Sequence, residues 1–257
     1  GLFPDWLAFL KRVPMLRAGE LVYPLRKARI ALALCDHRLL ADLVRCGYVR
    51  QTRDHGDYVL TTKLVSLGLS FLSNTGIVDV AQPLLDRLAE ISGELVRLSV
   101  IDGQRLTWVA RAQGARQGLR YDPDMGMDAR LSCTASGHAW LLTLSDERAL
   151  ELVSRQGFGQ PRDYGPQAPT TIVAFLAMLH AARERGYALI DEVFAPGMTA
   201  MAAPVIRGRE TVGVVSIAGP RQRLTPGRMQ QLAPAMLAVT AELGPISRVS
   251  TLSGKPK

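Results

Sequence analysis

The sequence predicts an α+β protein with two parts of unequal size. In the smaller, N-terminal part, a helix over residues 29–47 leads into two short β runs joined by a polar turn. In the larger part, strands and helices mix without strict βαβ alternation, which favours a mainly antiparallel sheet flanked by helices. The most informative segment, residues 187–226, places three strand-like apolar runs around an acidic turn and a hairpin and then begins a helix.

Size and composition place the chain among ordinary globular proteins. It has 257 residues, 47% apolar and 21% charged, so it is long enough to bury a substantial core and too apolar for extensive disorder. No window reaches the roughly 18 uncharged apolar residues that a membrane span needs. Residues 2–10 are apolar but precede Lys11 and Arg12, the reverse of the charge order in a signal peptide. We therefore expect a cytoplasmic protein with no membrane partner.

The cysteines and histidines are too scattered to indicate a disulfide framework or a metal centre. They are Cys35, Cys46, Cys133, His37, His55, His138 and His180. We expect no metal and no cofactor.

The net charge of +8 is concentrated near the N-terminus. Residues 1–63 hold 11 Lys or Arg against 6 Asp or Glu, a balance of +5, whereas the remaining 194 residues hold 20 against 17, a balance of +3. A basic segment of this kind is a weak indication of nucleic-acid binding, and a solvated basic surface is the alternative.

The N-terminal helix is predicted from leucines at helical spacing and from its end at Gly47, a residue suited to the left-handed position after a helix. Two β runs, 48–52 and 58–61, follow around a Gly-containing turn. A helix that feeds a hairpin near a basic N-terminus is typical of a winged helix-turn-helix. A second leucine stripe, from Leu64 to Leu72, predicts another helix.

The larger part begins with a helix and two strands. Apolar residues recur at helical spacing over residues 80–92 and alternate with other residues over 95–100. A turn then leads to a partner strand over 106–111, and a further helix starts near Thr134.

The last third of the chain alternates helices with strands. Residues 171–185 predict a helix that ends at Gly186, and strands are expected at 187–190, 201–206 and 212–217. The final helix has Thr225 at its N-cap and Pro226 at its first position, which is a strong start signal.

Several motifs, taken in order, resemble the IclR family of bacterial transcription regulators. They are Gly47-Tyr48-Val49, Tyr58-Val59-Leu60, Leu67-Gly68, the Leu84…Leu88-Ala89 helix, the run Ser132-Cys133-Thr134-Ala135-Ser136-Gly137-His138-Ala139, and the 187–226 block. Together they cover roughly residues 38–245, and the last is the most specific.

The resemblance implies a domain plan and a function. The plan is a winged helix-turn-helix DNA-binding domain over residues 1–61, a linker helix over 62–76, a GAF-like effector-binding domain over 77–248, and a flexible tail over 249–257. The function is that of an effector-responsive transcriptional regulator, a homodimer or homotetramer that binds double-stranded promoter DNA and a small-molecule effector. The leucine stripe of the linker is the candidate dimer seam, with packing against its own effector domain as the alternative.

The chain departs from the family pattern where the recognition helix begins. Such proteins usually have a Gly-Leu-Pro turn and a Ser-Thr pair there, whereas this chain has Ile30-Ala31-Leu32 and Leu34-Cys35, which offer no hydroxyl for phosphates or base edges. DNA binding is therefore expected from basic side chains, namely Arg26, Lys27, Arg29, Arg38 and, at the hairpin tip, Arg53. The alternative is a ligand-binding module of the same fold with weakened or lost DNA binding.

The resemblance also implies an effector site. Its anionic end is expected at the helix start Thr134-Ala135-Ser136-Gly137, because free amides and a hydroxyl there suit a carboxylate; an ordinary capped helix is the alternative. Positions that are often polar in members binding small polar acids are mostly apolar here, which favours an aromatic or apolar carboxylate. Those positions are Ile190, Ala200, Ser216 and Ala218. Candidate lid or wall residues, with core packing as the alternative, are Trp108, Leu119, Met125 and Met127.

Two groups of residues could suggest an enzyme active site, but a structural role is the favoured interpretation for both. Asp191-Glu192 lacks a nearby histidine or second carboxylate cluster and is expected to be a solvated turn or an interface pair. Cys133 and His138 are five residues apart, so on one helix they project in different directions and the histidine does not activate the thiol. We expect no catalytic residue and no enzyme activity.

Overall fold

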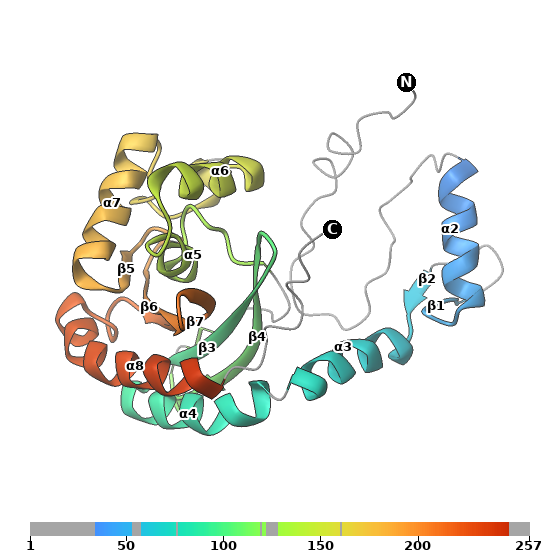
Figure 1. Cartoon of the computed structure of the whole chain (residues 1–257), viewed down its shortest axis with the longest axis horizontal. Helices are drawn as coiled ribbons and strands as arrows, with labels where there is room; N and C mark the ends of the chain where they lie inside the picture. Colours follow the sequence, from blue (N-terminus) through green and yellow to red (C-terminus); the bar gives the residue numbers. More distant parts are fainter. Residues whose placement is uncertain are drawn as a thin grey trace. The chain divides into compact units, whose positions relative to one another are not determined.

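The computed structural model describes residues 34–52, 58–75, 77–118, 120–121, 128–159 and 161–246, and Figure 1 shows its elements. The chain divides into two compact units, of which the first ends at Phe71 and the second begins at Leu72. The elements are α2 (Leu34–Arg45), β1 (Val49–Gln51), β2 (Tyr58–Leu60), α3 (Thr62–Thr75), α4 (Ile77–Ser92), β3 (Leu95–Asp102), β4 (Arg105–Gln113), α5 (Ala135–Leu141), α6 (Asp146–Gln156), η1 (Pro161–Asp163), α7 (Ile172–Arg185), β5 (Ala188–Asp191), β6 (Met198–Arg207), β7 (Glu210–Pro220) and α8 (Pro226–Ile246).

The first unit contains the expected helix and hairpin. Gly47 follows α2 with a φ of 75°, and its amide donates to the carbonyl of Val44, so the glycine ends the helix as predicted. Strands β1 and β2 pair in antiparallel fashion. The hydroxyl of Thr61 donates to the Gly47 carbonyl at 2.5 Å, and Nζ of Lys63 donates to the Cys46 carbonyl at 2.7 Å. These two bonds fasten the end of the hairpin to the end of the helix.

The second unit is built on a five-stranded antiparallel sheet with the order β4-β3-β7-β6-β5. Helices α4 and α8 lie together on one face, and α5, α6 and α7 lie on the other (Figure 1). The α+β class and the antiparallel sheet are therefore confirmed. Four of the predicted strands lie within the longer strands β3, β4, β6 and β7, whereas the strand predicted over 187–190 begins and ends one residue later, as β5.

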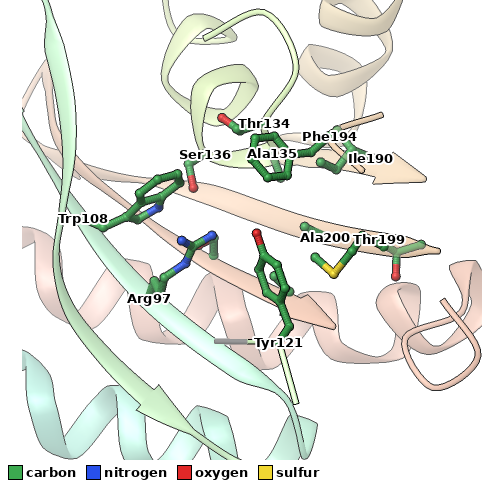
Figure 2. Close-up of a pocket in the computed structure, with 13 residues that line it drawn as sticks. Arg97, Trp108, Tyr121, Thr134, Ala135, Ser136, Ile190, Phe194, Thr199 and Ala200 are labelled. Carbon is green, nitrogen blue, oxygen red and sulfur yellow. The ribbon is translucent and has the colours of Figure 1, made fainter. Parts of the chain in front are cut away.

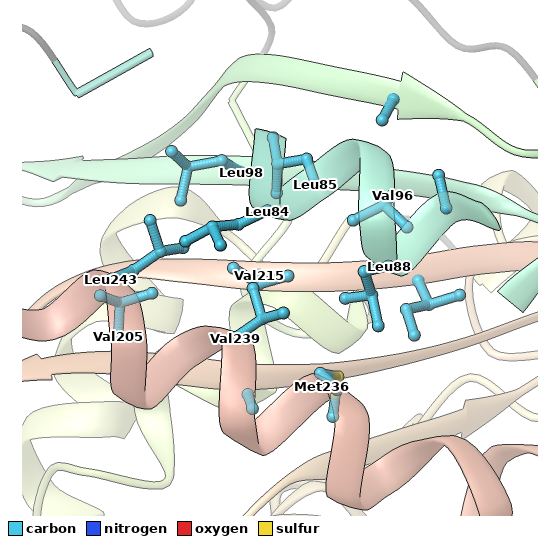
Figure 3. Packing of buried hydrophobic residues seen from close by; sticks show 14 of the residues in the cluster. Leu84, Leu85, Leu88, Val96, Leu98, Val205, Val215, Met236, Val239 and Leu243 are labelled. Carbon is cyan, nitrogen blue, oxygen red and sulfur yellow. The ribbon is translucent and has the colours of Figure 1, made fainter. Parts of the chain in front are cut away.

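One face of the sheet packs on α4 and α8 through a continuous apolar layer (Figure 3). Leu85 and Leu88 of α4 and Met236 of α8 are fully buried against alternate residues of β3 and β7. A fully buried apolar side chain of this size stabilises the fold by roughly 1.5–3 kcal/mol. This layer holds the sheet in place and thereby positions its opposite face, which carries both polar and apolar side chains.

A β-bulge decides which residues of β4 reach that other face. Ser99 of β3 pairs with Trp108, whereas its neighbour Leu98 pairs with Ala110, so Val109 is the extra residue of the bulge. Trp108 consequently lies with the residues of the α5 side, and Ala110 lies with those of the α4 side. Without the extra residue, positions 108 and 110 would share one face.

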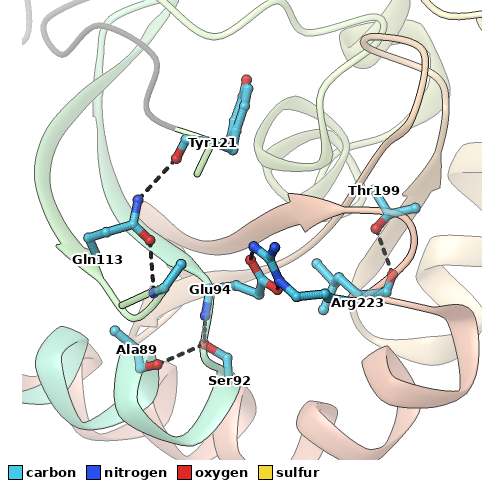
Figure 4. Close-up of polar contacts among 9 residues, drawn as sticks. Ala89, Ser92, Glu94, Gln113, Tyr121, Thr199 and Arg223 are labelled. Atoms are coloured by element: carbon cyan, nitrogen blue, oxygen red, sulfur yellow. Dashed lines mark hydrogen bonds and ion pairs between the residues drawn. The ribbon is translucent and has the colours of Figure 1, made fainter. Parts of the chain in front are cut away.

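An ion pair between a buried glutamate and an exposed arginine joins the two turns that flank the sheet (Figure 4). Glu94, 3% exposed, lies between α4 and β3 and accepts two bonds from Arg223, at 2.6 and 2.8 Å. A Cβ added at Gly219 would come within 2.5 Å of the Glu94 carboxylate, so a larger residue there would have to displace this side chain. Because both carboxylate oxygens of Glu94 accept hydrogen bonds from Arg223, this pairing raises the pKa of the Arg223 guanidinium.

Candidate ligand-binding site

The α5 side of the sheet holds a partly open cavity (Figure 2), and its empty space together with the adjoining open solvent amounts to about 380 Å³. Its floor comes from β3, β4, β6 and β7, and its other walls come from the start of α5, the end of β5 and the turn before β6. The lining residues are Arg97, Trp108, Tyr121, Thr134, Ala135, Ser136, Ile190, Phe194, Met198, Thr199, Ala200, Ser216 and Ala218.

Most of the residues that the sequence assigned to an effector site surround this one cavity. Thr134, Ala135, Ser136, Ile190, Ala200, Ser216 and Ala218 all line it. Gly137 does not, because a Cβ added there would point at Leu131 and come within 2.5 Å of its Cα. Leu119, Met125 and Met127 lie outside the described residues.

The start of α5 uses much of its own hydrogen-bonding capacity. The Oγ1 of Thr134 accepts from the Gly137 amide at 2.9 Å and donates to the carbonyl of Arg130 at 2.6 Å. The amide of His138 donates to the Thr134 carbonyl at 3.0 Å. Thr134 is therefore a helix cap, and the hydroxyl of Ser136 is the one that reaches towards the cavity in Figure 2.

Arg97 is a cavity residue that sequence reasoning did not single out. It is 5% exposed, and its Cζ lies 3.9 Å from the ring centroid of Trp108 and 5.8 Å from that of Tyr121. Its Nε and Nη1 are buried and have no hydrogen-bond partner within the described ranges. Burial lowers the pKa of Arg97 to about 10, which Tyr121 partly opposes, so the guanidinium is charged at neutral pH.

Other polar atoms beside Arg97 are hydrogen-bond donors. Ser216 stands directly opposite Arg97 in the β3–β7 register, so the two side chains share a face. The Oγ of Ser216 and the Nε1 of Trp108 are buried, and neither has a partner among the residues described. Burial raises the pKa of the Tyr121 hydroxyl, which keeps it protonated. This end of the cavity thus carries a positive charge and several donors.

The rest of the wall is apolar. Ile190 and Ala200 are paired in the β5–β6 register, and Ala218 pairs with Ala200 from the other side. Phe194 and Met198, from the segment between β5 and β6, complete this surface. No carboxylate side chain stands among the described lining residues, so the cavity combines one cationic end with an apolar body.

The possible catalytic groups have structural roles. Burial raises the pKa of the Cys133 thiol to about 12, and the ring of His138 is bonded through Nε2 to the Ser132 carbonyl at 2.9 Å. Asp191 accepts two bonds from Arg221, and a carboxylate oxygen of Glu192 accepts from the Gly197 amide at 2.8 Å. Through these hydrogen bonds, the acidic turn connects the end of β5 to the start of β6 and to the residues after β7.

Neither a metal centre nor a membrane-spanning helix is found in the described part of the chain. No group of three or more histidine, cysteine or carboxylate side chains within it is arranged to hold a metal ion. None of its helices has the length and apolar character that crossing a bilayer requires.

The residues predicted to bind DNA lie mostly beyond what the structure describes. Arg26, Lys27, Arg29 and Arg53 are outside the described residues. Arg38 is a residue of helix α2.

Comparison with known proteins places this fold and cavity in context. The chain is 28% identical over 209 residues to the transcriptional repressor IclR of Escherichia coli, covering 80% of this chain and 75% of that one. The structure resembles an IclR family transcriptional regulator from Brucella abortus with a TM-score of 0.65, at 23% identity, covering 80% of this chain and 77% of that one. It also resembles the inducer-binding domain of the PobR transcription factor from Acinetobacter with a TM-score of 0.57, at 25% identity, covering 65% of this chain and 97% of that one.

The family itself is shown by a match to the model of the bacterial transcriptional regulator IclR C-terminal domain. The match spans residues 69–244, which is more than half of the chain and contains the sheet, its flanking helices and every lining residue of the cavity. The protein belongs to the IclR family of bacterial transcriptional regulators.

Proposed function

We propose that this protein is an effector-responsive, DNA-binding transcriptional regulator whose cavity binds a small aromatic or apolar carboxylate. Its family consists of transcriptional regulators rather than enzymes, with DNA-binding and effector-binding domains. The observation that carries the proposal is the cavity between α5 and the sheet, with one charged end and an apolar wall. Apolar pockets with a few convergent polar groups are typical small-molecule sites.

The apolar wall supports a ligand with an apolar or aromatic body. A small polar acid would leave Ile190, Ala200 and Ala218 facing unmatched polar atoms, and burying such atoms without partners costs free energy. The related PobR domain was crystallised, as a double mutant, in complex with 3-hydroxybenzoic acid. A domain of this fold therefore accommodates an aromatic acid, which is the chemical class proposed for this chain.

Family membership and the N-terminal charge support promoter DNA as the second partner. The first unit combines α2 with the β1–β2 hairpin, and residues 1–63 carry a net charge of +5. We propose Arg26, Lys27, Arg29, Arg38 and Arg53 as its phosphate and base contacts, within a DNA-binding domain over residues 1–61.

We also propose that the chain acts as a homodimer or homotetramer through the linker helix. Leu64 and Leu67 of α3 are 41% and 51% exposed, which is a large apolar exposure for one helix. An effector alters DNA binding only if it binds two arrangements of the oligomer with different affinity. Sedimentation of an L64E/L67E variant tests the seam: we expect a smaller assembly than the wild type, and an unchanged one would contradict it.

A gel shift with the DNA that flanks the gene tests the regulator proposal. We expect a sequence-specific complex whose affinity falls steeply with salt, because phosphate contacts release counterions, and whose stability changes when an aromatic acid such as benzoate is added. A Ser136→Trp variant places an indole in the cavity and should lose the response to the acid while still binding DNA. A response that persists in this variant would show that the effector site lies elsewhere.

The second candidate function is a ligand-binding module that has lost its affinity for DNA. It is motivated by Ile30-Ala31-Leu32 and Leu34-Cys35, which replace the hydroxyl-bearing start of the recognition helix. The same gel shift separates the two functions, because absence of any sequence-specific complex at low salt, with ligand binding intact, would favour the module.

A further inference from the structure

We propose that Arg97 is the carboxylate-binding residue of the cavity, and that the effector is a monocarboxylate with an uncharged body. This inference rests on the proposed effector function and deepens it. It places the anion at Arg97 on the sheet rather than at the start of α5, where Thr134 and the Gly137 amide are already bonded to each other.

The first support is the state of the Arg97 side chain. An arginine that is 5% exposed is normally paired with a carboxylate, because a buried charge without a counter-charge is costly. Here, Nε and Nη1 lack a partner in the described parts of the chain, and the neighbours of the guanidinium are the ring of Trp108 and the neutral side chain of Tyr121, whose hydroxyl also interacts with it. A bound carboxylate would supply the negative charge and the acceptors that the described neighbours of Arg97 do not provide.

The second support is that the neighbouring atoms match a carboxylate. The Oγ of Ser216 and the Nε1 of Trp108 are buried, unpartnered donors beside Arg97, and Figure 2 shows the guanidinium between Trp108 and Tyr121 on the floor of the cavity. A carboxylate has two oxygens and accepts about four hydrogen bonds, including a paired set from one guanidinium. A neutral amide has only one acceptor oxygen and would leave some of these donors unbonded.

The third support concerns the remainder of the ligand. Arg97 is the one charged side chain among the described lining residues. A second carboxylate would be placed against Ile190, Phe194 and Met198, where nothing charged faces it, and its desolvation would be uncompensated. The cavity therefore selects acids with a single charge and an apolar or aromatic body.

The test is calorimetric titration of the full chain with matched pairs of compounds. The probes are benzoate and cyclohexanecarboxylate, their primary amides, and terephthalate as a dicarboxylate. We expect at least one monocarboxylate to bind the wild type at least ~30-fold more tightly than its amide and than terephthalate, which corresponds to about 2 kcal/mol. Quenching of Trp108 fluorescence, absent in a W108F variant, should accompany this binding because the indole contacts Arg97.

Variants assign the preference to Arg97. R97Q should weaken binding of the acid at least ~30-fold and leave the amide unchanged, whereas R97K, which keeps the charge but loses the planar fork, should keep some preference for the acid. S216A and W108F each remove one donor and should weaken the acid about 3- to 10-fold. The matched control is R87Q, an exposed arginine of α4 on the other face of the sheet, which should bind like the wild type.

The possible failures are distinguishable. Equal binding of the acid by R97Q and wild type, equal affinity for acid and amide, or no binding of any acid to the wild type would each overturn the assignment of Arg97. If the acid binds through Arg97 but leaves the protein–DNA complex unaltered, the regulator proposal fails and the assignment of the carboxylate to Arg97 stands.

Discussion

Replacing Arg97 with methionine should stabilise the protein in the absence of ligand, which is the reverse of the usual effect of a core substitution. The lowering of the Arg97 pKa to about 10 reflects how burial disfavours its charged form, an effect that Tyr121 partly opposes. At about 1.4 kcal/mol for each pKa unit, this amounts to about 3 kcal/mol at neutral pH. Contact with the Trp108 face offsets about 1–2 kcal/mol. Methionine is unbranched and adaptable, so we expect R97M to gain about 1–2 kcal/mol.

Urea unfolding measures this gain. Trp108 and Trp140 belong to the second unit and Trp6 to the first, so in a W6F background tryptophan fluorescence follows the part of the chain that contains the sheet. Far-ultraviolet circular dichroism checks the helices. With a denaturant dependence of about 2 kcal/mol per molar, the midpoint should rise by roughly 0.5–1 M. The gain in stability of R97M should shrink above about pH 10. Because its pKa is lowered in the folded protein, Arg97 loses its proton there at a pH at which Arg97 of the unfolded chain is still protonated, so the wild type no longer holds a buried charge.

An exposed arginine, Arg87, provides the control for this substitution. R87M removes an exposed arginine that is paired with Glu242, so its unfolding free energy should stay within about 0.5 kcal/mol of that of the wild type. If R97M is less stable than the wild type by 1 kcal/mol or more, the guanidinium is already well satisfied in the free protein, and the reasoning about its buried charge is wrong.

Three further predictions follow from the packing. Cys133 should resist iodoacetamide up to about pH 9 while exposed Cys46 reacts, as peptide mass spectrometry would show, because burial raises the Cys133 pKa to about 12; rapid native labelling would contradict this. E94Q should lower the unfolding free energy by about 2 kcal/mol in urea, since Arg223 loses its buried counter-charge, and a change under 0.5 kcal/mol would refute that role. G137A should cost about 1–3 kcal/mol in the same assay because its Cβ meets backbone, and wild-type stability would show that the contact relaxes freely.

Much of the fold was predictable because its signals are local. Thr134, Thr171 and Pro226 mark helix starts through groups within the first turn, and the structure begins α5, α7 and α8 where they indicate. Gly47 and Gly186 end helices in left-handed conformations that glycine adopts without strain. In each case the deciding atoms lie within a few residues of one another.

The cavity was predictable only in part. The resemblance to a family assigned Ser136, Ile190, Ala200, Ser216 and Ala218 to a ligand site, and the structure brings these residues together around one cavity. Gly137 resembled a site residue in sequence, but its role is close packing against the turn at Leu131. A motif shows where the chain approaches a site and does not show which way each position faces.

The sequence by itself determined the α+β class, the helix and strand positions and the family, since periodicity, caps and ordered motifs are properties of neighbouring residues. Only the tertiary structure decided that Arg97 is a buried charge. In the alternating pattern of a strand, Arg97 does not differ from other polar positions. Its burial depends on α5, which covers the sheet, and on Tyr121 and Ser216, which are distant from it in sequence. The bulge at Val109, which turns Trp108 towards the guanidinium, is a register shift between two strands and leaves no mark in either strand alone.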